Sequence, residues 1–101
     1  MERYLNDLDY AERARVIDKI AELEEQGRDI LKRGHDHADY LRDDIYELRA
    51  RYLRKRHRIL FFFFHRGKVV LTSALLKKSG PVADSHIKRA IEYRQDYLSR
   101  H

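Results

Sequence analysis

The chain has 101 residues, 43% of them hydrophobic and 39% charged, with a net charge of +5 and no cysteine. This supports a single domain over residues 1–101 and excludes disulfides, thiolate metal ligands and cysteine nucleophiles. The longest apolar run, residues 59–64, is too short to span a membrane, and no signal-peptide pattern opens the chain, so we expect a cytoplasmic protein.

Helices are predicted at the start of the chain. Residues 2–8 are amphipathic over one or two turns, and Asp9 then occupies an N-cap position with Glu12 three residues later. The helix that follows carries one apolar stripe, formed by Tyr10, Ala14, Ile17 and Ala21 and widened by Ile20 and Leu23. Gly27 ends this helix, and the polar residues 28–39 predict a loop with a helical turn.

Residues 41–78 predict three consecutive antiparallel strands. Apolar and charged residues alternate over residues 45–52, as in a half-buried strand. Residues 59–64 are continuously apolar, as in a central strand that is buried on both faces. A Gly-containing turn at residues 65–68 then leads into a β-branched run, which closes the second hairpin.

A final helix is predicted over residues 82–99, after a turn at residues 79–81. Its narrow apolar face is formed by Ala83, Ile87, Ala90, Ile91, Arg94 and Leu98. Its opposite face is basic and aromatic and carries Lys88, Arg89, Tyr93 and Tyr97. We therefore expect this helix to be anchored by one apolar stripe.

The charge distribution suggests what the sheet is used for. Residues 1–26 hold eight acids and four bases, so the rest of the chain carries +9. Six Lys or Arg and no acid lie between Arg49 and Arg58, and Lys77 and Lys78 follow. In a meander Arg49, Arg58 and Lys77 converge on one surface, which suits a phosphate backbone. A solvated basic surface explains the composition equally well, but paired arginines on neighbouring strands favour a function.

Other motifs carry less weight. His35 and His37, with Asp36 and Asp39, resemble a metal site, but the remaining histidines lie among Arg and Lys, so a solvated loop is favoured and no metal is expected. The phenylalanine run favours core packing over base stacking. No Ser-His-Asp order, P-loop, Gly-rich dinucleotide turn or HExxH motif is present, so the chemistry expected is that of cationic groups acting on a phosphodiester.

Four motifs in order give the chain a family resemblance. They are Tyr46-Glu47-Leu48-Arg49 (preceded by Leu41), His57-Arg58-Ile59-Leu60-Phe61-Phe62, Lys77-Lys78, and Ile87-Lys88-Arg89-Ala90 followed by Tyr97. In this order they resemble the phage-derived, HigB-like branch of the RelE/ParE toxin superfamily, and the likeness covers about residues 9–98. The resemblance implies the toxin of a type II toxin–antitoxin pair, an mRNA endonuclease (mRNA interferase) that works in the ribosome and inhibits translation.

The resemblance also assigns roles to residues. Arg49 and Arg58 would hold the scissile phosphate, Lys77 or Lys78 would act as base or stabilise charge, and Tyr97 would stack or donate. Further RNA contacts are expected from Arg51, Arg54, Lys55, Arg56 and Tyr93. The implied partners are a helix-turn-helix antitoxin, the ribosome and mRNA, with operator DNA bound only through the antitoxin and with no cofactor and no membrane.

The implied fold is α+β: a small antiparallel sheet of three strands that lacks the family's first strand, with the N-terminal helices on one face and a C-terminal helix. Ser73, Ala74 and Leu75 stand where the family has an aromatic residue and often a histidine. Two alternatives remain: a ParE-like or decayed relative that binds gyrase or only its antitoxin, and a basic RNA-binding module that does not cleave. The nuclease hypothesis requires Arg49 and Arg58 to share one side of the sheet without being locked into carboxylates in the core.

Overall fold

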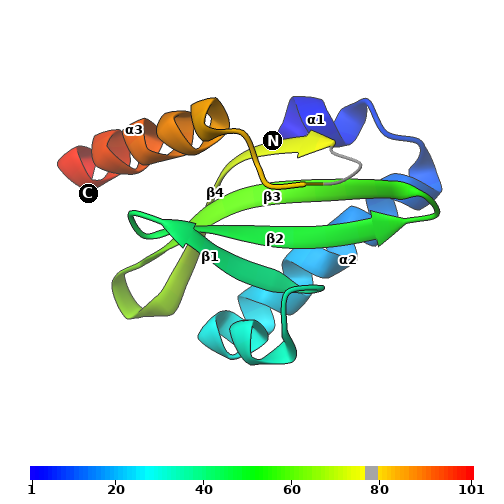
Figure 1. Ribbon diagram of the computed structural model, residues 1–101, viewed down its shortest axis with the longest axis horizontal. Coiled ribbons are helices and arrows are strands. Elements are labelled where there is room, and N and C mark those ends of the chain that lie inside the picture. Colours follow the sequence, from blue (N-terminus) through cyan, green and yellow to red (C-terminus); the bar gives the residue numbers. More distant parts are fainter. Residues whose placement is uncertain (77–79) are drawn as a thin grey trace.

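The computed structural model describes residues 1–76 and 80–101. Its elements are α1 (Glu2–Asn6), α2 (Tyr10–Gln26), η1 (Gly27–Arg33), β1 (Ala38–Arg42), β2 (Ile45–Tyr52), β3 (Lys55–Phe64), η2 (His65–Gly67), β4 (Lys68–Leu76) and α3 (Asp84–Arg100). The strands form an antiparallel sheet in the order β1-β2-β3-β4, with α2 and α3 on opposite sides of it (Figure 1). In the described part of the chain, no helix is long and apolar enough to cross a membrane.

The predicted fold is corrected in two respects. The sheet has four strands within the described residues, where three were predicted, because Ala38–Arg42 pairs with β2 as an edge strand. This segment is only five residues long and mixes charged with apolar residues, so its alternation was too short to identify from the sequence. Helices also cover both faces of the sheet, since the C-terminal helix packs opposite α2.

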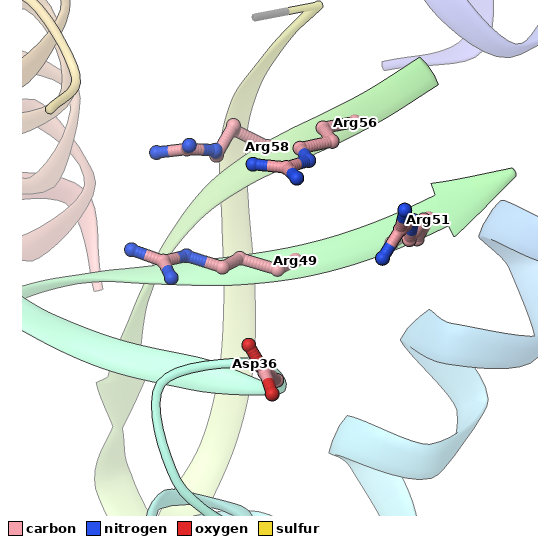
Figure 2. Close-up of a pocket in the computed structure, with 6 residues that line it drawn as sticks. Asp36, Arg49, Arg51, Arg56 and Arg58 are labelled. Atoms are coloured by element: carbon pink, nitrogen blue, oxygen red, sulfur yellow. The ribbon is translucent and has the colours of Figure 1, made fainter. Parts of the chain in front are cut away.

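The α3 face of the sheet is only partly covered. Ile87 and Ala90 of α3 are buried against Leu60 and Phe62 of β3, together with Ile45 at the start of β2. The other half of this face carries charged side chains, most of them arginines (Figure 2). The apolar layer under α3 therefore ends where the basic segments of β2 and β3 begin.

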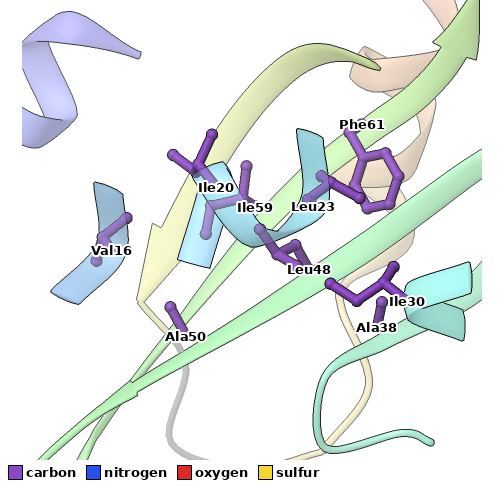
Figure 3. Packing of buried hydrophobic residues seen from close by; sticks show 9 residues of the cluster. All are labelled: Val16, Ile20, Leu23, Ile30, Ala38, Leu48, Ala50, Ile59 and Phe61. Atoms are coloured by element: carbon purple, nitrogen blue, oxygen red, sulfur yellow. The ribbon is translucent and has the colours of Figure 1, made fainter. Parts of the chain in front are cut away.

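The α2 face carries the larger core. Val16 and Leu23 of α2 are fully buried against Leu48 of β2 and against Ile59 and Phe61 of β3 (Figure 3). The alternation predicted for residues 45–52 is confirmed, because Leu48 and Ala50 lie in this core while the alternating Arg49 and Arg51 line a pocket on the other face. At about 25 cal/mol per Å² of buried apolar surface, a core side chain such as Leu48 contributes roughly 1.5–3 kcal/mol.

The ends of α2 follow the sequence signals. The side chain of Asp9 accepts a hydrogen bond from the Glu12 backbone N–H at 2.8 Å, which confirms Asp9 as the N-cap. Gly27 ends the helix with φ of 58°, a left-handed conformation that favours glycine. Glu12 does not complete a capping box, because its carboxylate is buried and binds His57 instead.

Candidate functional site

A basic pocket of about 260 Å³ lies on the uncovered half of the α3 face. It is lined by Arg49, Ala50 and Arg51 of β2, Arg56 and Arg58 of β3, and Asp36 of the loop before β1. Figure 2 shows the arginine side chains of the two strands next to one another, with Asp36 beside them. We call this the arginine pocket.

The pairing of β2 with β3 brings the arginines together. Arg49 lies directly opposite Arg58, and Arg51 lies opposite Arg56. Side chains two residues apart on a strand share a face, so the two cross-strand pairs point to the same side of the sheet. Arg51 and Arg56 are exposed, Arg49 is half-buried, and Arg58 is only 4% exposed. The pocket thus has a buried cation at its floor and exposed cations at its mouth.

Glu47 holds the inner pair of arginines. Its Oε1 atom accepts a hydrogen bond from Arg49 Nε at 2.7 Å and lies 2.8 Å from Arg58 Nη1. The Arg58 contact is an ion pair off the hydrogen-bond direction, because Nη1 and Nε of Arg58 have no hydrogen-bond partner among the described residues. Glu47 itself is buried, with 1% of its surface exposed. The single carboxylate of Glu47 is therefore the counter-ion of two guanidiniums but accepts a hydrogen bond from only one of them, that of Arg49.

The requirement set from the sequence is met in its first part and not in its second. Arg49 and Arg58 do share one side of the sheet, but both are paired with the buried Glu47, and Arg58 is itself buried. The pocket nevertheless remains cationic, because the carboxylates of Glu47 and Asp36 balance only two of the four guanidinium charges. An anion that enters the pocket therefore meets a net positive charge.

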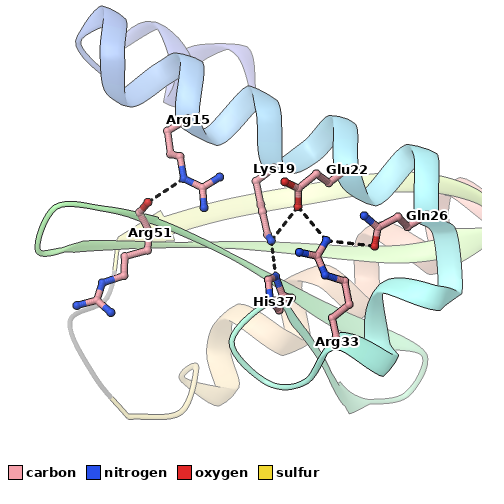
Figure 4. A network of polar contacts seen from close by, with 7 residues as sticks. All are labelled: Arg15, Lys19, Glu22, Gln26, Arg33, His37 and Arg51. Atoms are coloured by element: carbon pink, nitrogen blue, oxygen red, sulfur yellow. Dashed lines mark hydrogen bonds and ion pairs between the residues drawn. The ribbon is translucent and has the colours of Figure 1, made fainter.

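A polar network under α2 fixes the loop that carries Asp36. Lys19 Nζ, on a side chain that is almost fully buried, lies 2.6 Å from His37 Nδ1 and 3.0 Å from Glu22 Oε2 (Figure 4). The backbone carbonyl of His37 accepts a hydrogen bond from Arg49 N at 2.9 Å. Burial and the cations of Lys19 and Arg33 lower the pKa of His37, so its neutral ring accepts from the ammonium group.

The same network ties α2 to the edge of the pocket. Arg15 Nε donates to the backbone carbonyl of Arg51 at 3.1 Å. Arg33 contacts both Glu22 and Gln26 through Nη1, at 3.4 and 3.3 Å. These contacts hold the backbone of β2 and the Asp36 loop against one helix, so the pocket is built on rigid elements.

The other predicted site residues are dispersed. Lys77 and Lys78 lie outside the described residues. Tyr97 does not line the arginine pocket: its ring packs edge-on to Phe62 and Phe64 at 5.5 and 5.0 Å, on the buried side of α3, so its expected place on the opposite helix face is wrong. Phe62 is four residues along β3 from Arg58, or roughly 13 Å.

The predicted RNA contacts divide in the same way. Arg51 and Arg56 line the pocket, whereas Arg54 is exposed in the turn between β2 and β3. Lys55 Nζ lies 3.2 Å from Glu12 Oε1, and Tyr93 is 47% exposed on α3. Tyr93 and Lys55 are therefore outside the pocket, while Arg54 lies on the hairpin that presents it.

A buried polar cluster supports the start of β3 on the α2 face. His57 Nε2 lies 2.5 Å from Glu12 Oε2, and His57 Nδ1 lies 2.5 Å from the Tyr4 hydroxyl. His57 and Glu12 are 1% and 2% exposed. Burial and the Glu12 carboxylate raise the pKa of Tyr4 to about 12, so its phenol stays protonated. This cluster links α1, α2 and the strand that carries Arg56 and Arg58.

Sequence reasoning missed the two acidic residues of the site, Asp36 in the lining of the pocket and Glu47 buried beside it. Glu47 alternates with Arg49 and Arg51, so its position on their face was readable, but nothing marked it as buried. Asp36 was assigned to a possible metal motif, and only the fold places it beside β2. The histidines of that motif have separate partners, since His35 contacts Asp39 at 2.9 Å while His37 contacts Lys19. In the described ranges, no three His, Asp or Glu side chains gather as a metal site.

Comparison with known proteins identifies one matching family. The family model described as "Phage derived protein Gp49-like (DUF891)" matches residues 3–95, which is most of the chain and includes both arginine-bearing strands. Searches of the curated proteins and of the solved structures found no match.

Proposed function

Since the chain belongs to the phage-derived Gp49-like family, a known RelE-like toxin–antitoxin family, it is a toxin with an antitoxin partner, and we propose that it acts on mRNA through the arginine pocket. In this proposal the protein is a HigB-like, ribosome-dependent endoribonuclease that inhibits translation in the cytoplasm. The ribosome positions the message, and the pocket receives the sugar–phosphate backbone. The proposed partners are therefore the ribosome and mRNA, in addition to the antitoxin.

The observation that carries the proposal is the cross-strand alignment of arginines around an open pocket. Arg49 faces Arg58 and Arg51 faces Arg56, and Nε and Nη1 of Arg58 lack hydrogen-bond partners among the described residues. Four guanidiniums against the carboxylates of Glu47 and Asp36 leave a net positive charge, which a bound anion would balance. A phosphodiester fits because a planar guanidinium binds phosphate through two parallel N–H groups.

The chemistry assigned to the pocket is electrostatic. Attack of a 2′-hydroxyl on the neighbouring phosphate produces a phosphorane with added negative charge, and cleavage ends with loss of the 5′-oxygen. Arg49 and Arg58 would stabilise that charge in a partly buried setting, where such contacts are stronger than in water. Arg51 and Arg56, at the exposed mouth, would hold the adjacent phosphates. Lys77 and Lys78 remain proposals for proton transfer or charge stabilisation.

A specific observation favours a second function. Arg58 is paired with the buried Glu47, and no histidine lines the pocket among the residues that the structure describes. These features suit a toxin that grips RNA without cutting it, because a phosphate can be bound without any proton transfer. The two functions predict the same RNA contacts and differ only in whether the message is cleaved.

The test is expression of the protein under a tight promoter, with mapping of mRNA ends and a growth curve. The variant pair Arg51→Gln with Arg56→Gln removes two exposed cations and leaves the Glu47 group intact. The control is Arg89→Gln, an exposed cation on α3 outside the pocket. We expect growth arrest with cuts inside codons for the protein and the control, and neither for the pocket variant. Arrest with intact messages would support gripping without cleavage, and arrest that survives the pocket variant would refute both.

A further inference from the structure

Helix α2 is apolar on two faces that point in different directions. Its inner face packs on the sheet through Val16, Ile20 and Leu23. Its outer face carries Tyr10, Ala14, Ile17 and Ala21, all of them exposed. Tyr10 is 85% and Ile17 is 45% exposed. At about 100° per residue, the outer four positions fall within about 60° of arc, and their centre lies about 120° around the helix from the centre of the inner three. The apolar stripe predicted from the sequence corresponds to this outer face. Ile20 and Leu23, which were predicted to widen it, belong to the inner face.

The spacing of the outer face matches a seam between two helices. Its residues follow one another at intervals of four, three and four, and large side chains alternate with alanines. Helices pack through residues at this spacing, and small residues between large ones let the backbones approach. Single exposed apolar residues are ordinary, but a continuous seam over three turns is not required by a helix that already packs on a sheet. Among residues 1–76 and 80–101, no element covers it.

The charges beside the seam are acidic. Asp18, Glu24 and Glu25 flank its C-terminal half and are exposed. The nearby cations are engaged elsewhere: Arg13 donates to the backbone carbonyls of Leu5 and Leu8, and Lys19 is buried. This is the reverse of the arginine pocket, which is cationic and lies on the other side of the sheet. A complementary partner therefore combines an apolar stripe with basic flanks.

We propose that the outer face of α2 binds an amphipathic helix of the antitoxin, with apolar residues at matching intervals and Lys or Arg beside them. The proposal rests on the antitoxin partner that the family implies and is independent of any action on RNA. A second copy of this chain is disfavoured, because its own α2 presents acidic residues beside the seam where the complementary partner needs basic ones. This contact leaves the arginine pocket on the opposite face of the sheet open.

The absence of cysteine from the sequence allows a direct test. The single variants Ala14→Cys and Ala21→Cys report on the seam, and Ser85→Cys, which is exposed on α3, is the control. Maleimide labelling is timed for the free protein and for its complex with the polypeptide encoded by the adjoining reading frame. We expect complex formation to slow labelling of both seam cysteines by at least about tenfold, as for desolvated positions at the centre of an interface, and to leave Ser85→Cys unchanged.

A matched pair of substitutions measures the energetic role of the seam. Ile17→Glu places a charge in the seam, and Leu98→Glu makes the same change at a residue that is 40% exposed on α3. We expect Ile17→Glu to raise the Kd for the same polypeptide by about 30-fold or more, and Leu98→Glu to change it less than threefold. Circular dichroism of both variants should match the parent.

Several outcomes would overturn the proposal. They are equal labelling of the seam cysteines in the free protein and the complex, an unchanged Kd for Ile17→Glu, or no complex with the neighbouring polypeptide. Loss of self-association in Ile17→Glu with unchanged binding of that polypeptide would assign the seam to a second copy instead. Growth arrest separates this proposal from the proposed function: Ile17→Glu should remain toxic and escape neutralisation, whereas a protein inactive on RNA would still show the labelling pattern.

Discussion

Replacing Glu47 with glutamine should destabilise the protein strongly. The substitution keeps the size of the side chain and removes the charge that Arg49 and Arg58 share. Arg58 is 4% exposed, so its guanidinium would be left buried without a counter-ion. Removal of one partner of a buried pair costs about 3–5 kcal/mol.

The structure sets where in this range the effect should fall. The Arg58 contact at 2.8 Å is not aligned as a hydrogen bond, and the Arg49 side chain is 32% exposed and can be hydrated after the change. We therefore expect a loss near the lower end, about 3 kcal/mol. At about 4–8 °C per kcal/mol for a domain of this size, Tm should fall by roughly 12–24 °C.

Urea unfolding followed by circular dichroism measures this loss directly. Glu24→Gln on the exposed surface of α2 is the control, and its effect should stay within about 0.5 kcal/mol. The double variant Glu47→Leu with Arg58→Met removes the pair as a unit, so it should recover most of the stability lost in Glu47→Gln. A loss below about 1 kcal/mol in Glu47→Gln would refute the reasoning, because it would mean that Arg58 does not depend on this carboxylate.

Three further predictions follow from other parts of the structure. In salt titrations of single-stranded RNA binding, the Arg51→Gln and Arg56→Gln pair should reduce the slope of log K against log salt by about 1.4, without loss of stability. Tyr4→Phe should cost about 1–3 kcal/mol in urea unfolding, because it leaves the buried Nδ1 of His57 unpaired. In an ultraviolet titration, Tyr4→Phe should also remove the tyrosine whose pKa is about 12. Because folding raises this pKa from 10.0, the contribution of Tyr4 to stability is full below pH 10 and is lost as the pH rises toward 12. Since the folded protein lowers the pKa of His37 from 6.5, the unfolded chain is protonated first, so Tm should drop as pH falls below 6.5, and less so in His37→Gln.

The strands with clear periodicity could be predicted from the sequence. The strand Ile45–Tyr52 was predicted with its observed bounds, because alternation over eight residues leaves one solution for its two faces. The basic start of β3, Lys55–Arg58, was not included, since charged residues at the end of a strand carry no apolar signal. The edge strand Ala38–Arg42 was missed because it is short and buries only Ala38 fully.

The sequence was sufficient to predict which arginines form the candidate site, but not which carboxylates lie beside them. Runs of arginine on adjacent strands indicate convergence, which the pairing of Arg49 with Arg58 displays. That Glu47 is buried and contacts both Arg49 and Arg58 depends on how two strands pair, which no local pattern encodes. The apolar residues of α2 show the same limit, because periodicity finds apolar positions but does not say which of two faces meets the sheet.

The arginine pairs owe their alignment to the hydrophobic residues further along the same strands. Like charges directly opposite each other repel, so the pairing of the basic ends of β2 and β3 is unfavourable by itself. A slip of one residue, however, would turn Ile59 and Phe61 out of the α2 core and Arg58 into it. The apolar half of the hairpin thus sets the register of its charged half. Mutations that weaken the packing of the phenylalanine run should therefore misalign the arginine pairs before they unfold the protein.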